Sequence, residues 1–398
     1  MAVFNFCGKI SLGRESEKFK PIERRDFNSG WTNTTVRFNC LSGANRILCV
    51  AQGGKWVNDK KNAIKTFSKT TTDENGKVIK GEKIEIPWSK RFDTDQIDKV
   101  AGFRKLICDT GDVKMRYKLQ DLVDAFKNGT ITDEMMEEVG IDNLDDAKEA
   151  LEKSNAKKRV FLSEWDFAEH IAKVAASDKF KNKLFYISGN YDVQYNPEKH
   201  QFYTNYHVNR VVLAPDDAEP ATTLKVDFYF GEDAWNDDNY EETGKCYING
   251  WTNYYDNNAK KTGFKSIVVA VKEDEKKAKV LKRKFNVEDG IKQIGLTLNV
   301  IEGAERQEIT MEMLDDETRE DIEAGLLDFE SVKREMGGNV VGDRISELRF
   351  VELTPKKNTV QDTVYTMDDM GPAKVSVESA EDIVEDIFDD EDDLDDDL

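Results

Sequence analysis

The sequence has few of the residues on which catalytic and metal centres are usually built. Its 398 residues include three histidines and five cysteines, and no two cysteines form a CxxC pair. Neither an HExxH motif nor the GK[ST] of a phosphate loop is present. The acidic stretch 232–242 lacks the ligand spacing of a calcium loop. We therefore predict that the protein is not an enzyme and needs no metal or cofactor.

Long apolar runs are also lacking. None approaches the roughly 20 residues that a membrane-spanning helix needs. The opening residues, MAVFNFCGKISLG, have neither the basic nor the apolar region of a signal peptide. The odd number of cysteines favours reduced thiols over a disulfide framework. We expect a cytoplasmic protein with no membrane partner.

Charge is present in abundance but is unevenly distributed along the chain. The formal net charge is −21. Residues 1–118 nevertheless hold 24 Lys and Arg against 14 Asp and Glu, whereas residues 381–398 hold twelve carboxylates and no Lys or Arg. Blocks of like charge repel and stay disordered. The pattern predicts a basic front that can bind a polyanion and a disordered acidic tail.

Alternating apolar and polar residues predict strands in two regions. In the front region they cover Val3–Leu12, Thr32–Leu41 and Arg46–Gln52, the last ending at Gly53-Gly54, with a hairpin over Thr66–Ile86. Five more strands are expected within 184–271. Strands of this length suit small closed barrels, with a sandwich as the main rival. The expected fold class is α+β, β-dominated, with one or two small barrels and helical insertions.

Changes in composition predict five segments. Between the two β-rich regions, residues 119–156 carry eleven acids and three lysines at helical spacing, and Ser163 is expected to cap a following helix. The segments are a basic β-rich domain (1–118), a helical insertion with that helix (119–180), a central barrel (181–275), a mixed α/β segment (276–358), and a linker with the tail (359–398).

Aromatic and cationic side chains share the polar faces of several predicted strands. Binding of unpaired nucleic-acid strands needs cations for the phosphates and flat side chains on which bases stack. Candidates in the front region are Lys9, Arg37, Arg46, Lys55, Trp56, Trp88, Lys90 and Arg91. Candidates in the central region are Tyr186, Tyr203, His207, Tyr229 and Trp251. The alternative for each is an ordinary role, as core aromatic or solvated surface cation.

Three segments resemble a known family. KLFYISGNYDVQYNPEKHQFYTNYHVNRVVL resembles the first two strands of an oligonucleotide-binding (OB) fold, and FNFCGKISLG with TNTTVRFNCLSG resembles a weaker copy. EDIVEDIFDDEDDLDDDL is similar to the protein-recruiting tails of single-stranded DNA-binding proteins of bacteria and bacteriophages, although it ends in Leu rather than Phe. The resemblance implies OB-like barrels and apolar tail anchors at Ile387, Phe388, Leu394 and Leu398.

The function that this resemblance implies is sequence-nonspecific binding of single-stranded DNA, or RNA. Such a protein would protect single strands in phage DNA replication and recombination, in the host cytoplasm, and would recruit replication or recombination proteins through its tail. Two alternatives stay open: an acidic interaction protein (a DNA mimic, an assembly chaperone or a virion structural protein), and a metal-dependent nucleic-acid enzyme. The sequence leaves the oligomeric state, site size and cooperativity open.

Overall fold

Most of the chain is described by a computed structural model. The described residues are 2–17, 19–72, 76–238, 240–257, 259–272, 275–308, 311, 314–329, 331–332 and 339–373. The acidic tail expected at 381–398, with its four anchors, lies outside these residues. The architecture is β-dominated, as predicted.

Five strands close into a ring, which we call ring 1. They are β1 (Val3–Leu12), β3 (Trp31–Ser42), β4 (Asn45–Trp56), β11 (Leu184–Asn196) and β12 (Gln201–Leu213). Four of the pairings are antiparallel: β1 with β3, β1 with β11, β3 with β4, and β11 with β12. The fifth is parallel and closes the ring between β4 and β12.

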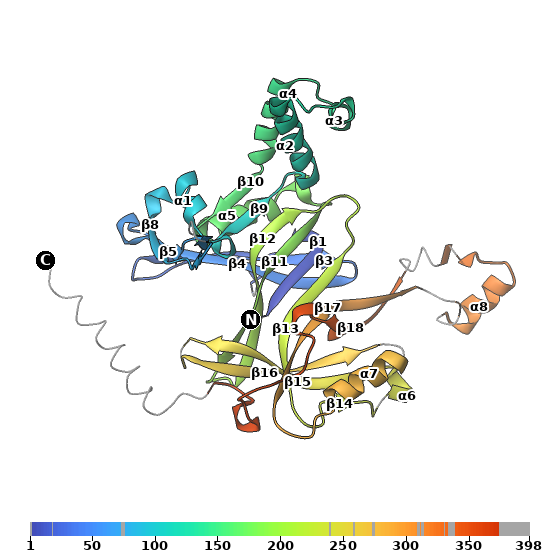
Figure 1. Ribbon diagram of the computed structural model, residues 1–398. Helices are drawn as coiled ribbons and strands as arrows, with labels where there is room; N and C mark the ends of the chain where they lie inside the picture. Colours follow the sequence, from blue (N-terminus) through green and yellow to red (C-terminus); the bar gives the residue numbers. More distant parts are fainter. Residues whose placement is uncertain are drawn as a thin grey trace.

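Ring 2 repeats this strand order. It consists of β13 (Ala221–Phe230), β15 (Cys246–Asp256), β16 (Lys261–Val271), β17 (Lys292–Glu308) and β18 (Asn339–Leu353). Here the parallel closing pair is β16 with β18, and the other four pairings are again antiparallel. Pairing of β1 with β13 and of β4 with β17 joins the two rings, which lie one above the other in Figure 1.

The strand pairing does not follow the expected segment boundaries. Strands β11 and β12, expected in a central barrel, close instead on strands of the first 56 residues. Strands β17 and β18, expected in a separate mixed segment, close on β13 and β16. The change from ring 1 to ring 2 therefore falls between β12 and β13.

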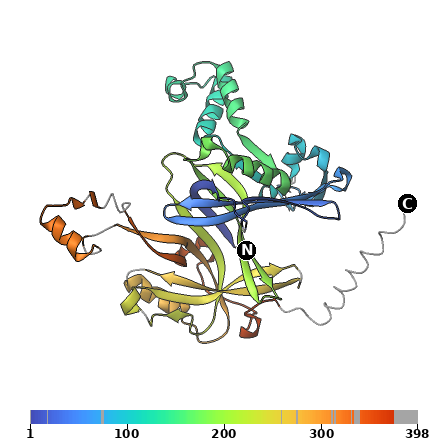
Figure 2. The same ribbon diagram turned by 180° about the vertical axis from the view of Figure 1, so that it is seen from behind.

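The remaining elements decorate the rings. Those of the ring 1 half are β2 (Ile22–Asp26), β5 (Ala63–Phe67), β6 (Thr71–Thr72), β7 (Val78–Ile79), β8 (Lys83–Pro87), α1 (Thr94–Lys99), β9 (Leu106–Asp109), α2 (Val113–Asn128), α3 (Asp133–Val139), α4 (Leu144–Asn155), β10 (Lys158–Phe161) and α5 (Glu164–Ala175). Those of the ring 2 half are β14 (Trp235–Asn236), α6 (Tyr240–Thr243), α7 (Glu275–Phe285), α8 (Asp316–Glu323) and β19 (Gln361–Asp362). Helices α2–α4 project at one end, and the β17–β18 hairpin carries α8 away from the rings (Figures 1 and 2).

Several local predictions are confirmed. The front strands and the hairpin are present, the latter as the pairs β5–β8 and β6–β7. Residues 119–156 are helical, and the Ser163 hydroxyl accepts a hydrogen bond from the Asp166 backbone N–H at 3.3 Å. The expected end of the third strand is wrong, because β4 continues through Gly53 and Gly54 to Trp56. These glycines allow a close approach rather than a turn, since a Cβ atom at Gly53 would overlap the backbone of Glu164 and Trp165.

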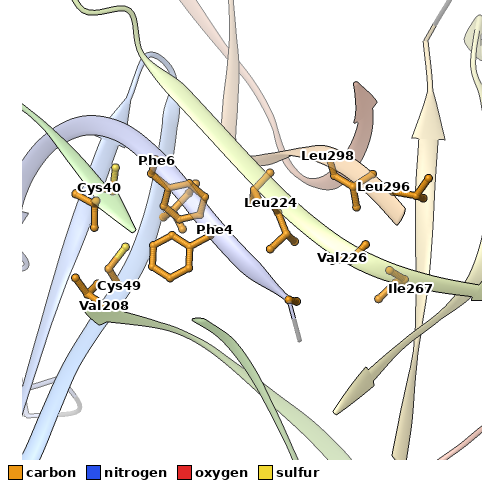
Figure 3. Packing of buried hydrophobic residues seen from close by; sticks show 14 of the residues in the cluster. Phe4, Phe6, Cys40, Cys49, Val208, Leu224, Val226, Ile267, Leu296 and Leu298 are labelled. Atoms are coloured by element: carbon orange, nitrogen blue, oxygen red, sulfur yellow. The ribbon is translucent and has the colours of Figure 1, made fainter. Parts of the chain in front are cut away.

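One apolar core runs through both rings. Phe4 and Phe6 of β1 pack with Cys40 and Cys49 in ring 1, and the same cluster continues through Leu224 of β13 into ring 2 (Figure 3). Inward-facing residues at alternate positions of every strand supply it, which is why period-two alternation was informative. Among the described helices, none is both long and apolar enough to cross a membrane.

The contact at Gly53 makes a testable prediction. Gly53→Ala should lower the free energy of unfolding by about 1–3 kcal/mol, because α5 or β4 must shift to admit the new methyl group. Gly102→Ala is the matched control, since nothing lies within 4 Å of a Cβ atom at that position. Denaturant titrations of both variants would measure the difference. Equal stability of the two would contradict the close packing of α5 on β4.

Candidate functional site

A groove of about 830 Å³ opens where the ends of β3 and β4 meet β11 and β12. The lobe of β5, β8 and the loop before β9 forms one wall, and the start of α5 forms part of the floor. We call it the tryptophan groove. The side chains used below are Trp31, Asn33, Gln52, Trp56, Lys61, Lys65, Phe103, Arg104, Glu164, Asn190, Asp192, Gln194, His207 and Asn209.

Three aromatic side chains from three elements converge in the groove. Trp31 at the start of β3 is paired with Trp56 at the end of β4, and their ring centroids lie 5.3 Å apart in an edge-to-face arrangement. Gly54 makes room for them, because a Cβ atom there would overlap the Trp31 indole. Phe103, from the 3₁₀ turn Gly102–Arg104, also lines the groove and is 77% exposed. The arrangement leaves aromatic surface facing open space.

Cations flank these aromatic rings. The Lys61 Nζ atom lies 5.4 Å from the centre of the Trp56 ring. The Arg104 guanidinium lies 5.4 Å from the Phe103 ring and 5.3 Å from the Phe67 ring. Lys65 lines the same wall and is exposed. The positive charge is therefore placed beside the aromatic surface, where a cation also gains from the π face.

Polar side chains of β11 and β12 form the other side of the groove. Asn190 is opposite His207, Asp192 is opposite Asn205, and Gln194 is opposite Tyr203. Directly opposed residues of an antiparallel pair point to the same face. This face thus carries amides, one carboxylate, an imidazole and a tyrosine, a set able to donate and to accept hydrogen bonds.

Two carboxylates lie within the groove among the cations. Desolvation raises the pKa of Asp192, although the nearby His207 works against this effect. The Asp192 Oδ2 atom lies 3.7 Å from His207 Nε2. Desolvation also raises the pKa of Glu164, against the influence of His207 and Arg104. Among the described residues, no three His, Cys, Asp or Glu side chains group as metal ligands would.

The structure brings together some of the residues expected from the sequence. Trp56 and His207 line the groove, and Tyr203 extends its β12 side. Lys55 lies next to Trp56, with its Nζ atom 5.1 Å from the Trp165 ring. Asp192 and Gln194 were not among the expected residues, although they follow Asn190 at alternate positions of β11 and so lie on the same face of the strand.

Three expected binding residues, Trp88, Arg91 and Arg37, make close contacts within the protein. Trp88 also lines the groove, but it is 8% exposed, and the Arg91 guanidinium lies 4.2 Å from its ring. Arg91 in turn forms an ion pair with Asp166, with 2.7 Å between Nε and Oδ2. Arg37 is half-buried and pairs with Glu23 at 3.0 Å. These side chains take part in packing and internal ion pairs, and their contact with a nucleic acid stays a prediction.

The aromatic candidates of the central region, Tyr229, Trp251 and Tyr186, differ in burial and lie at different places in the structure. Tyr229 is 5% exposed, because Phe264 and Tyr365 pack on its ring at 5.1 and 5.9 Å. Trp251 packs against the same cluster and is half-buried. Tyr229 therefore presents no open stacking face, whereas Trp251 keeps part of its surface exposed. Tyr186 is exposed, but it lies in a different hollow, together with Arg210.

Three cationic candidates, Lys9, Arg46 and Lys90, are exposed but do not line the groove.

The chain has few detectable similarities to known proteins. No protein-family model and no curated protein matches the chain. Among solved structures, it is similar to the wild-type single-stranded DNA-binding protein from Thermus aquaticus, with a TM-score of 0.32 and 6% identity over 92% of this chain and 98% of that chain. A deletion mutant of the same protein matches with a TM-score of 0.26 and 7% identity over 76% of this chain and 87% of that chain. Both TM-scores are too low to assign a function to this chain by similarity.

The raised pKa of Asp192 predicts a pH-dependent stability. An ionised carboxylate is disfavoured in the folded state here, so Asp192 lowers the free energy of unfolding once the pH has risen through its raised folded pKa. This cost is absent below the ordinary pKa of 3.8, where the carboxyl group is protonated in both states. Asp192→Asn should therefore stabilise the protein at neutral pH, with a gain that shrinks as pH falls. Denaturant titrations at neutral and mildly acidic pH would measure it. A gap between Asp192→Asn and wild type that stays constant over this pH range would contradict desolvation of Asp192.

Proposed function

We propose that the tryptophan groove binds single-stranded DNA without strong sequence preference. The observation that carries this proposal is the convergence of Trp31, Trp56 and Phe103 with Lys61 and Arg104 in one open groove. Bases of an unpaired strand offer flat faces to aromatic side chains, and each stacked base contributes roughly 1–3 kcal/mol. Cations at the groove edge would meet the phosphates.

The polar side of the groove suits base edges rather than phosphates. Amides such as Asn190 and Gln194 can donate and accept, so they can serve any of the four bases. The carboxylates Asp192 and Glu164 would repel phosphates but can accept hydrogen bonds from base amino groups. We infer that the bases point into the groove while the backbone follows Lys61, Lys65 and Arg104. Such an arrangement favours weak sequence preference.

We further propose that each ring is an OB-type barrel. An OB barrel has five strands in a Greek-key order, and oligonucleotides bind against its second and third strands and its flanking loops. In ring 1 the second and third strands are β3 and β4, which carry Trp31 and Trp56. The position of the groove thus agrees with the assignment, and so does the placement of α5 between the third and fourth ring strands.

The biological role that we propose is protection of single strands during phage DNA replication and recombination. The acidic tail, through Ile387, Phe388, Leu394 and Leu398, would recruit partner proteins and compete with DNA for the basic groove. The described chain leads towards this tail from a fixed point on ring 2. The Phe264 N–H donates to the Gly371 carbonyl at 2.7 Å, and the Ala373 N–H donates to the Tyr254 hydroxyl at 3.4 Å.

The proposal predicts a preference for single strands. Wild-type protein should bind oligo-dT at least tenfold more tightly than duplex DNA of equal length, because only unpaired bases can stack. Trp56→Ala should weaken oligo-dT binding by roughly 1–3 kcal/mol and leave the weaker duplex binding unchanged. Fluorescence anisotropy would measure both. Affinity should also fall with salt, with a log–log slope of about −0.7 per phosphate contact.

The matched control is Phe92→Ala, an exposed aromatic of the same lobe that does not line the groove. Its affinity should equal that of wild type. Melting temperatures of both variants separate a lost contact from a lost fold. Equal affinity of wild-type protein for duplex and oligo-dT would refute the proposed function.

The tail makes a separate prediction. Deletion of residues 381–398 should tighten oligo-dT binding at low salt, because a tethered competitor has an effective concentration of about millimolar. Screening should reduce the difference as salt rises. A second variant with the twelve carboxylates replaced by Asn and Gln keeps the length of the tail and should behave like the deletion. Unchanged affinity in both variants at low salt would show that the tail does not compete.

A further inference from the structure

A second hollow, on ring 2, lies beside the far end of the tryptophan groove. It has a volume of about 370 Å³, and its lining includes Asn253, Tyr255, Asn257 and Thr262 from the β15–β16 hairpin of ring 2. Its opposite side is formed by Asp192 and Gln194 of β11. Both of these residues also line the tryptophan groove. The two spaces are therefore contiguous across one strand.

Strand β11 connects the two spaces over a short distance. Residues at alternate positions of a strand point to the same face and lie roughly 6–7 Å apart. Asn190, Asp192 and Gln194 thus span about 13 Å on one face. This face carries side chains with donors and acceptors along its whole length, so it can accompany a nucleic-acid strand from ring 1 to ring 2.

The β11–β12 hairpin is packed firmly against ring 2. Phe202 packs edge-to-face on Tyr254, with centroids 5.9 Å apart, and Tyr195 lies 4.9 Å from Phe202. The Lys265 Nζ atom of β16 lies 3.4 Å from the Tyr191 hydroxyl. These contacts set the position of the hollow relative to the groove. The two sites therefore form one surface rather than two independent ones.

The chemistry of the hollow matches that of the groove. Tyr255 is 59% exposed and presents an aromatic face, while Asn253 and Asn257 supply amides. Lys260, in the turn that joins β15 to β16, and Lys261, the first residue of β16, are exposed and precede Thr262 of the lining. An aromatic face, amides and flanking cations are the same three components found in the tryptophan groove.

We propose that this hollow is a second nucleotide-binding site, in which Tyr255 stacks with a base of the strand that leaves the tryptophan groove over Asp192 and Gln194. The inference rests on the proposed function of the groove. It assigns to ring 2 a share of the binding site, and it gives the β11–β12 hairpin the role of a bridge. A strand must then exceed a minimum length to contact both rings.

The experiment compares two lengths of oligo-dT on the full chain. One OB-type domain binds about 4–16 nucleotides, so an oligomer of about 6 fills one site and one of about 30 can reach both. Tyr255→Ala should weaken binding of the long oligomer by roughly 5- to 150-fold and leave the short one unchanged. Tyr255→Phe keeps the stacking face and should retain wild-type affinity. Tyr117, on α2, is also exposed, at 69%, so Tyr117→Ala is the control and should change neither affinity.

Two results would overturn the proposal. Unchanged affinity of Tyr255→Ala for both lengths would show that the hollow is not used, and an equal loss for both would place Tyr255 in the primary site or in the fold. Asn257→Asp serves as a second variant, because a new negative charge in the hollow should weaken only the long oligomer. Failure of the proposed function is distinguishable, since wild-type protein would then bind neither oligomer.

Discussion

The parallel pairing of β4 with β12 is the constraint on which the architecture of ring 1 depends. It joins residues about 150 positions apart, with Cys49 beside Tyr206 and Val50 beside His207. Closing so long a loop costs entropy, which the core around Phe4, Phe6 and Phe38 offsets through burial. The same closure carries Trp56, six residues further along β4, to the side of β12 on which His207 lies. The groove is thus a consequence of ring closure.

The long insertion between β4 and β11 is what gives the groove its second wall. The chain leaves ring 1 at the end of β4 and re-enters it at the start of β11, so residues 57–183 form the connection between these two strands. Phe103 and Arg104, from the 3₁₀ turn before β9, line the same groove as the two tryptophans. Arg91 ties the lobe of β5 and β8 to the rest through Asp166 of α5, whose start is packed closely on Gly53. The ion pair of Arg91, whose guanidinium also lies over the Trp88 ring, therefore helps to hold the wall of the groove.

Local features of this fold could be predicted from the sequence, whereas the long-range pairing could not. Alternation located nearly every ring strand, since each has one face in the core, and Ser163 marked the start of α5. The grouping of strands failed because strand alternation carries no information about partners, so β11 and β12 were assigned to one central barrel (181–275) with β13, β15 and β16. For the site, composition pointed to Trp56 and His207, which line the groove, and to Tyr203, which lies opposite Gln194. It could not separate Trp56 from the more buried Trp88, because both stand beside lysines and arginines.

The two rings share a strand order but differ in what covers their aromatic residues. In ring 2 the chain after β18 returns across the sheet, and Tyr365 packs 4.8 Å from Phe264 and 5.9 Å from Tyr229. Asp362 and Thr363 fasten this segment through Lys292 and the Ile291 carbonyl. In ring 1, by contrast, Trp31 and Trp56 line the open tryptophan groove. Identical topology thus yields one ring whose aromatic cluster stabilises the fold and one whose aromatic residues stay accessible. The exposed Tyr255, on the hairpin beyond the covered cluster, is the part of ring 2 that retains the open character of ring 1.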